Sequence, residues 1–466
     1  MLIENMKNEL SKEELIKQVI TYAKEYLDKE DSLRVYPDEQ ALKELEIYDE
    51  EMPEKSMNSS KVLELLHKHG SNATVHHTGG NYYGFVMGSN LPVSQAARIL
   101  GDIWDQNAGL YISSPISDKL EETCERWLVT LLGLPQGTAA SFVSGSSMAN
   151  FYSMLTARNE LLYRQGYDVV TNGLYHAKPI RVVLGKEAHS SVIKALVLAG
   201  FGKENFEYVP VDSQGRMLVD EVPELDSNTL LILQAGHVNT GAFDEFDILC
   251  DKANQAGAWV HIDGAFGLWA AASKEHRYLT RGIEKADSWT TDAHKTLNVP
   301  YDCGMAFCKE RAGLIKAMQA TGSYLQFSEH RDGMLYGVEM SRRARAIELW
   351  AALKYLGKEG IAELIDTLCE NAQYLAECLH SIGLHVENEV VYNQVIAHLD
   401  TDEETDKLLL AIQNSGELWC GGAMHQGNKV IRFSVCSWKT TRKEIDKNVA
   451  YIGKLIDREN IQVESD

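Results

Sequence analysis

Short apolar runs alternate with amphipathic stretches over residues 92–350, and this alternation restricts the fold more than any other feature of the sequence. The runs at 181–184, 230–234 and 259–262 have the length and apolar character of buried strands. Two parallel strands can be joined only by a crossover connection, which is usually a helix. Strands separated by helical stretches therefore usually pair in parallel. We therefore expect an α/β fold with a mostly parallel central sheet flanked by helices.

The N-terminal region does not follow this pattern. Residues 12–28 place Leu15, Val19, Ala23 and Leu27 at helical spacing, after Ser11 as a predicted N-cap. A second short helix is predicted at 61–69. Residues 1–75 are therefore expected to form a helical arm that packs on another surface.

The C-terminal region has a different order of elements. Two helical stretches run to about residue 382, an apolar strand is predicted near 389–398, and VIRFSVCSW at 430–438 precedes a long last helix. This order predicts a small α+β domain at 351–466 beside a large domain at 76–350. The boundary between them is soft, because 343–356 has the pattern of one continuous helix.

Charge and hydropathy exclude several classes of function. The chain has 45 Lys and Arg against 67 Asp and Glu, a net charge of −22, which disfavours binding to nucleic acid or to anionic membranes. No apolar stretch is long enough for a transmembrane helix, and the N-terminus lacks the apolar core of a signal peptide. The eight cysteines form no CxxC pair, so we expect reduced thiols, no metal site and a cytoplasmic location.

One segment is suited to binding a phosphate group. FVSGSSMAN at 142–150 predicts a strand end, a small-residue turn and a helix start. The free N–H groups of a helix start, together with the hydroxyls of Ser146 and Ser147, favour an anion. An ordinary capped helix has the same pattern, and no Walker motif follows.

Three further segments carry chemically versatile side chains. His189 opens a predicted helix in KEAHSSV, and Asp263 ends a predicted strand in WVHIDGAFG, at the strand end where α/β sheets bind ligands. Lys295 follows in DAHKTLNVP, and a desolvated lysine amine condenses readily with aldehydes. Each residue also has an ordinary structural explanation. Together they supply the phosphate site, stacking ring, carboxylate and amine that pyridoxal 5′-phosphate requires.

From about residue 76 onward the chain resembles the group II pyridoxal-phosphate-dependent amino acid decarboxylases, which include glutamate and aromatic L-amino acid decarboxylases and have the fold type I architecture. The motifs AHSSV, HIDGAFG and DAHK carry the resemblance. It implies that Lys295 binds the cofactor aldehyde, with His294 beside it, and that Asp263 pairs with the pyridine nitrogen. It places Ala265 and His189 against opposite faces of the ring. It also places four residues at or beside the phosphate, namely Ser146, Ser147, Ser288 and Asp292.

The resemblance further implies a catalytic tyrosine on a loop. TGSYLQFS at 321–328 matches that loop and places Tyr324 29 residues after Lys295. In the family this tyrosine is thought to protonate the substrate carbon after carbon dioxide leaves, and the loop reaches the partner's site in a homodimer. AGHVNTGAFD at 235–244 departs from the usual AGTTxxGAxD, since His237 and Val238 replace two threonines.

These features predict decarboxylation of an L-amino acid, while two other functions stay open. A transaminase or carbon–sulfur lyase of the same fold needs different proton transfers, and a non-catalytic scaffold should have lost Lys295 or Asp263. The segment 76–92 matches the substrate side of the family and contains aromatic residues but no Arg or Lys, which favours an aromatic substrate. An acidic substrate such as glutamate is the alternative, because Arg432 or the Arg342–Arg343 pair could reach the site.

Overall fold

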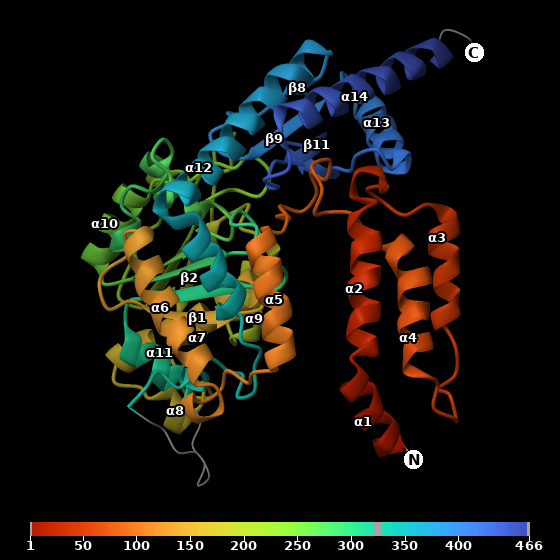
Figure 1. The fold of residues 1–466 in the computed structure, drawn as a ribbon. Helices are drawn as coiled ribbons and strands as arrows, with labels where there is room; N and C mark the ends of the chain where they lie inside the picture. The colour runs from red at the N-terminus through yellow and green to blue at the C-terminus, as the bar shows by residue number, and fades with distance from the viewer. Residues whose placement is uncertain (1, 320–328, 464–466) are drawn as a thin grey trace.

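The computed structural model describes residues 2–319 and 329–463, and a seven-stranded sheet forms the centre of its large domain (Figure 1). The strand order is β1-β7-β6-β5-β4-β2-β3. Strands β6, β5, β4, β2 and β3 run parallel, whereas β7 is antiparallel to both β6 and β1, which confirms the expected mostly parallel sheet. The strands are β1 (Ala139–Val143), β2 (Arg181–Gly185), β3 (Phe206–Val209), β4 (Thr229–Gln234), β5 (Trp259–Asp263), β6 (Ser288–Asp292) and β7 (Gly304–Cys308).

Helices cover both faces of this sheet because alternate residues of each strand point to opposite faces. On β2, Val183 belongs to one buried cluster, and its neighbours Val182 and Leu184 belong to another. The first cluster includes residues of α6, α10 and α12, and the second includes residues of α7, α9 and α11. The helices of the large domain are α5 (Pro92–Trp104), α6 (Pro115–Leu131), α7 (Ser146–Arg164), α8 (Val169–Asn172), α9 (Ser190–Leu198), α10 (Phe246–Ala256) and α11 (Arg311–Met318).

The small C-terminal domain is an antiparallel sheet with helices against it, in the order β10-β11-β9-β8. The connection from the large domain is α12 (Ala346–Ser381), so the boundary expected near residue 350 falls inside a helix. Gly357, with φ of 61°, interrupts the helical backbone within α12. The other elements of this domain are β8 (His385–Val386), β9 (Gln394–His398), α13 (Asp402–Ser415), β10 (Gly421–His425), β11 (Asn428–Ser434) and α14 (Arg442–Val463).

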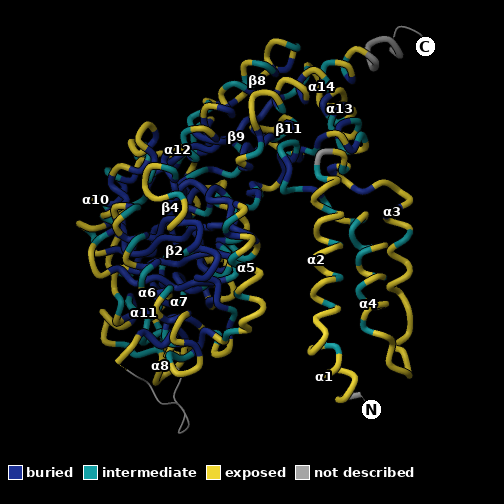
Figure 2. The backbone as a smooth tube through the Cα atoms, viewed as in Figure 1, coloured by how far each residue is buried: buried dark blue, intermediate teal, exposed yellow. Residues whose placement is uncertain are grey.

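The N-terminal helices stand beside the large domain as an arm (Figure 1). They are α1 (Leu2–Lys12), α2 (Glu14–Leu27), α3 (Glu39–Glu44) and α4 (Ser59–Leu65). The predicted N-cap at Ser11 is wrong, since Ser11 lies inside α1 and the break falls at Glu13, which has a left-handed φ of 55°. Most arm residues are exposed, as Figure 2 shows, so the apolar stripe of α2 has little cover within one chain.

No helix within residues 2–319 and 329–463 is both long enough and apolar enough to cross a membrane.

Candidate active site

The carboxyl ends of neighbouring parallel strands bring the predicted residues to one edge of the sheet. Asp263 is the last residue of β5, and Asp292 is the last residue of β6. His189 caps α9 just after β2, and Ser146 begins α7 just after β1. Ligands of open α/β sheets bind at this edge, so the topology creates a site there.

Lys295 lies at the centre of this cluster. Its Nζ is 3.1 Å from Asp292 Oδ2 and 3.5 Å from Ser146 Oγ. Asp292 is buried, and the Ser146 hydroxyl donates a hydrogen bond to it. His294 Nε2 lies 3.5 Å from the same carboxylate oxygen, and burial lowers the pKa of His294. The lysine is therefore held at a defined position by buried polar groups.

Two glycines permit this close packing. A Cβ on Gly304 would lie 2.6 Å from Asp292 Oδ1 and 2.6 Å from the Cα of Gly145. A Cβ on Gly145 would lie 3.2 Å from the His294 ring. Larger residues at either position would displace Asp292 or His294, so the local sequence is fitted to this cluster.

Asn298 shapes the turn that carries Lys295, and the sequence analysis missed it. Its φ of 56° is a left-handed conformation that asparagine tolerates better than most residues. Its Oδ1 accepts hydrogen bonds from the N–H groups of Ser89 (2.8 Å) and Trp438 (3.1 Å), and its Nδ2 donates to the carbonyl of Cys436 (2.9 Å). Asn298 thereby ties the lysine turn to the segment that contains Ser89 and to the small domain.

Asp263 is buried and accepts three hydrogen bonds. Oδ1 accepts from the Ala265 N–H (3.2 Å) and the Thr290 hydroxyl (3.3 Å), and Oδ2 accepts from Asn150 Nδ2 (3.4 Å). These three hydrogen bonds fix the direction of the carboxylate. Asn150 and Thr290 are a second omission of the sequence analysis, because neither occurs in a pattern that marks it.

A buried histidine stands behind Asn150. His261 Nε2 lies 2.9 Å from Asn150 Oδ1, and its Nδ1 lies 2.9 Å from Ser288 Oγ. Burial lowers the pKa of His261 to about 3, so this ring stays neutral. Asn150 already uses its amide to donate to Asp263, and its oxygen accepts from the neutral ring. The chain His261–Asn150–Asp263 is thus a fixed support for the carboxylate.

The placement of Ser288 corrects the expectation that it contacts or flanks the phosphate. Ser288 begins β6, whereas Asp292 ends it, so the length of the strand separates the two residues. The Ser288 hydroxyl instead accepts a hydrogen bond from Trp259 Nε1 (3.0 Å) and contacts His261. It supports the core behind the site.

His189 presents a neutral ring at the site. Its Nδ1 accepts a hydrogen bond from the Ser191 N–H (3.2 Å), so the Nδ1 lone pair is engaged in capping α9. Partial desolvation lowers the pKa of His189, and the charges of Lys295 and Arg432 lower it further, while Asp263 opposes them. An uncharged, anchored imidazole is suited to stacking against an aromatic ring.

The structure fits pyridoxal 5′-phosphate at this edge. The first turn of α7 has N–H groups without a side-chain cap, beside the hydroxyls of Ser146 and Ser147, which suits an anion. The Lys295 amine can bind an aldehyde, and the Asp263 carboxylate can bind a protonated ring nitrogen. Ala265 stands two residues after this strand end, and its carbonyl accepts from the Asp292 N–H (2.9 Å). Within the described part of the chain no cluster of side chains is suited to holding a metal ion.

An aromatic cluster is formed by the segment that the resemblance assigns to the substrate side and by the small domain. The Tyr82 and Phe85 rings both stack on Trp419, each with ring centroids 5.2 Å apart. The same segment contacts the lysine turn, because a Cβ on Gly88 would lie 2.1 Å from the Lys295 carbonyl oxygen. Phe85 and Val86 have φ of 53° and 57°, which is strained for residues of this size. Trp419 comes from the small domain, which the sequence alone did not connect to this segment.

Arg432 is the arginine that the structure brings to this cluster. It lies on β11, its Nη1 donates to the Val238 carbonyl (3.2 Å), and its Nε is buried without a hydrogen bond among the described residues. Burial lowers the pKa of Arg432. Burial also raises the pKa of the Tyr82 hydroxyl to about 12. Arg342 and Arg343 are instead held by carboxylates, Arg342 by Glu121 (2.7 Å) and Arg343 by Glu348 and Asp302.

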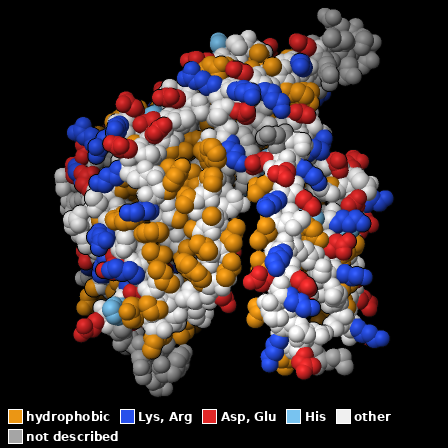
Figure 3. Space-filling model, in the orientation of Figure 1, with side chains coloured by type: hydrophobic (Ala, Val, Ile, Leu, Met, Phe, Trp, Pro, Cys, Tyr) orange, Lys and Arg blue, Asp and Glu red, His pale blue; other side chains and the backbone are white. Residues whose placement is uncertain are grey.

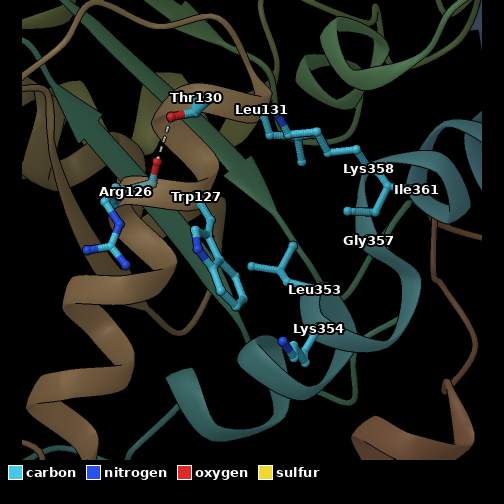
Figure 4. A pocket seen from close by; sticks show the side chains of 9 residues that line it. All are labelled: Arg126, Trp127, Thr130, Leu131, Leu353, Lys354, Gly357, Lys358 and Ile361. Atoms are coloured by element: carbon cyan, nitrogen blue, oxygen red, sulfur yellow. Dashed lines mark hydrogen bonds between the residues drawn. The ribbon is translucent and has the colours of Figure 1, made fainter.

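The predicted catalytic residue Tyr324 lies outside the residues that the structure describes. A separate pocket of about 470 Å³ between α6 and α12 is lined by Trp127, Leu353 and other residues shown in Figure 4, and none of the residues of the cluster around Lys295 borders it.

The profile of the pyridoxal-dependent decarboxylase conserved domain matches residues 41–396. Aromatic-L-amino-acid decarboxylase of Bacillus atrophaeus is 29% identical over 68% of this chain and 66% of its own length. Acidic amino acid decarboxylase GADL1 of Bos taurus is 28% identical over 61% of this chain and 56% of its own length. Cysteine sulfinic acid decarboxylase of Mus musculus is 27% identical over 61% of this chain and 60% of its own length. The chain thus covers less than two thirds of the length of each of these relatives.

Solved structures share the fold. The Oryza sativa TDC structure with PLP and tryptamine has a TM-score of 0.88 and 18% identity, covering 97% of this chain and 98% of that one. Mouse CSAD has a TM-score of 0.87 and 21% identity, covering 96% and 98%. The relatives include enzymes named for aromatic and for acidic substrates.

Proposed function

The chain belongs to the pyridoxal-dependent decarboxylase family, and on this basis we propose that it decarboxylates an L-amino acid to the corresponding amine and carbon dioxide. The observation that carries the proposal is the meeting of Lys295, Asp263, His189 and the start of α7 at one sheet edge. When bound there, pyridoxal 5′-phosphate supplies an electron sink for cleavage of a bond at the α-carbon.

Each residue has a separate task in this proposal. The Lys295 amine binds the cofactor aldehyde, with His294 beside it, and the Asp263 carboxylate holds a proton on the ring nitrogen. His189 and Ala265 enclose the ring between them. Because Asp263 is buried and three hydrogen bonds fix its direction, it holds that proton without competition from water.

The phosphate is assigned to the N-terminal turn of α7, with Ser146 and Ser147, and Asp292 lies beside it. Asp292 accepts from Ser146 and contacts Lys295 Nζ, so it orients both groups. Tyr324 is assigned, from the family resemblance, as the donor of a proton to the substrate carbon. A tyrosine at this position favours simple decarboxylation over transamination or oxidative formation of an aldehyde.

We propose an aromatic L-amino acid as the substrate class. The segment that contacts the lysine turn supplies Tyr82 and Phe85, and the small domain adds Trp419. Stacked aromatic walls bind flat or apolar side chains well, and no cation occurs in 76–92.

An acidic substrate is the second candidate, and Arg432 is the observation that favours it. Its guanidinium has no carboxylate partner among the described residues and is partly desolvated, which suits binding of a substrate carboxylate. Arg432 could serve the α-carboxylate that all candidate substrates share, or the distal carboxylate of an acidic one.

A substrate panel tests both candidates. The protein is supplied with pyridoxal 5′-phosphate and each common L-amino acid, and released carbon dioxide and amine are measured. We expect kcat/KM for tryptophan, tyrosine or phenylalanine to exceed that for glutamate and aspartate, and Phe85→Ala to reduce it. The reverse order of kcat/KM would establish the acidic class, and no carbon dioxide from any amino acid would refute decarboxylation.

We also propose a homodimer with active sites at the interface. Figure 3 shows hydrophobic side chains gathered on the face of the large domain beside the arm, and Ile99 and Ile103 of α5, which faces the arm in Figure 1, are 57% and 63% exposed. A pocket of about 770 Å³ between the arm and the body is lined by Val19, Leu27 and other residues. A second copy would cover both apolar surfaces of one chain. Sedimentation should show a dimer, and a fully active monomer would contradict it.

All eight cysteines are unpaired, and all except Cys378 are buried, which supports the proposed cytoplasmic location.

A further inference from the structure

The loop after β4 contains the two residues that depart from the family motif, and the proposed function gives neither of them a task. His237 is buried, with 1% of its surface exposed. A large polar ring at such a position requires partners, because an unpaired buried polar group is costly. Its contacts show how the loop is connected to the candidate site.

The His237 ring is enclosed by three neighbours. Its Nε2 lies 3.1 Å from Glu187 Oε2, which is ion-pair distance without the geometry of a hydrogen bond, and its Nδ1 accepts a hydrogen bond from the Thr240 N–H (3.4 Å). On a third side stands Gly215, with φ of 83°, where a Cβ would lie 2.7 Å from the ring. Any side chain at residue 215 would collide with the imidazole, so the surrounding backbone leaves space for this ring.

Glu187 connects His237 to the stacking histidine. It stands two residues before His189, in the turn between β2 and α9. Glu187 is 40% exposed along its side chain and makes no other ion pair among the described residues. The contact with His237 lowers the pKa of Glu187, which keeps the carboxylate charged. Without His237 this side chain has no other ion-pair or hydrogen-bond partner within residues 2–319 and 329–463, and the turn that presents His189 loses a tie to the sheet.

The same loop also holds the small domain. The carbonyl of Val238 accepts the hydrogen bond from Arg432 Nη1 (3.2 Å), and Asn239 Nδ2 donates to the Met424 carbonyl (3.3 Å). His237, Val238 and Asn239 are consecutive, so one short segment contacts the His189 turn on one side and Arg432 on the other.

We propose that His237 is a positioning residue, which fixes His189 through Glu187 and fixes Arg432 through the Val238 carbonyl. This inference rests on the proposed function, since it assigns His189 to the cofactor ring. It explains the departure from the family motif, because the imidazole spans to Glu187, a distance that the shorter threonine side chain cannot cover.

The test compares four variants by their binding of pyridoxal 5′-phosphate, which does not depend on turnover. The variants are His237→Ala, His237→Gln, Glu187→Gln and the double variant His237→Ala with Glu187→Gln. The control is His276→Asn, which removes another histidine–carboxylate pair, 3.0 Å from Asp366, outside this loop. The measurements are the cofactor dissociation constant, the visible circular dichroism of the bound cofactor and the melting temperature.

We expect His237→Ala and Glu187→Gln each to raise the dissociation constant by about tenfold, which is 1.4 kcal/mol, and to weaken the dichroism. The double variant should be no worse than either single one, because the pair acts as a unit. His237→Gln keeps an N–H donor and should recover most of the loss. His276→Asn should lower only the melting temperature.

Three results would overturn the proposal. His237→Ala could change only the melting temperature, as the control does, or the two single effects could add in full in the double variant. If His237→Ala fails to fold, Glu187→Gln decides alone, and a normal dissociation constant and dichroism in it refute the proposal. A wild-type protein that binds no cofactor overturns the proposed function itself, whereas normal binding in wild type and in both single variants overturns this inference only.

Discussion

Replacing Asp263 with asparagine removes one charge from the site with little change in shape. In the wild-type protein the carboxylate accepts from the Ala265 N–H at 3.2 Å, from Thr290 at 3.3 Å and from Asn150 at 3.4 Å. The asparagine oxygen can keep the first two of these bonds. Its NH₂ group would face the Asn150 NH₂ group, so one hydrogen bond is lost, which costs about 1–2 kcal/mol of folding free energy. The variant should therefore fold.

The effect on catalysis should be much larger. Two opposite unit charges about 3 Å apart interact by about 5.5 kcal/mol at an effective dielectric constant of about 20. This interaction is lost when the carboxylate becomes a neutral amide, although the amide oxygen still accepts a hydrogen bond. At about 1.4 kcal/mol per decade, kcat should fall by about three to four orders of magnitude.

Asp287→Asn is the matched control, because Asp287 is also a buried aspartate at an end of a sheet strand. Its carboxylate accepts from the Val260 N–H at 2.9 Å, away from Lys295. The assay is steady-state release of carbon dioxide from the best substrate of the panel, with urea unfolding of each variant. Asp287→Asn should lose stability without a comparable loss of kcat. An Asp263→Asn enzyme within about threefold of wild type, under 1 kcal/mol, would refute the role of Asp263.

Three further predictions concern stability and assembly. Glu121→Gln should cost about 3–5 kcal/mol in urea unfolding, because Glu121 Oε2 lies 3.1 Å from Arg331 and 2.7 Å from Arg342, and all three are buried; a cost under about 1 kcal/mol would contradict this. Burial lowers the pKa of His261 to about 3 in the folded protein, so between about pH 6.5 and pH 3 this ring binds a proton in the unfolded chain but not in the native one. The free energy of unfolding should therefore fall by about 1.4 kcal/mol per pH unit as the pH drops from 6.5 towards 3. His261→Gln should reduce that slope in urea titrations, and an unchanged slope would contradict the assignment. Mixing Lys295→Ala subunits with Tyr324→Phe subunits should restore amine formation, which each variant lacks alone, in hybrid dimers, provided the subunits exchange, and no recovery after proven exchange would contradict a shared site.

The sequence was informative where function coincides with the end of an element. His189 and Asp263 follow apolar runs, Lys295 stands in the DAHK motif after the next strand, and the carboxyl ends of parallel strands meet at one edge. Ser146 similarly marks a strand-to-helix turn. The prediction that Ser288 lies at the phosphate was wrong because Ser288 begins β6 and Asp292 ends it. A sequence motif does not show at which end of a strand a residue lies.

Residues that act across long sequence separations were not predicted. Asn298 is important because of a left-handed φ and bonds to Ser89 and Trp438, and neither feature is visible in a one-dimensional pattern. Trp419 joins Tyr82 only when the small domain packs on the large one. Ser11 was predicted as an N-cap because serine favours that position, yet helix α1 already includes it.

The central claim is that Lys295 holds the cofactor, and one measurement tests it directly. The purified protein is mixed with pyridoxal 5′-phosphate, reduced with borohydride, digested and examined by mass spectrometry, with Lys295→Ala treated in parallel. We expect a phosphopyridoxyl group on the peptide that contains Lys295, and its loss in the variant, which should still fold. A cofactor reduced onto another lysine in the wild-type protein, or an unlabelled Lys295 peptide at saturating cofactor, would contradict it.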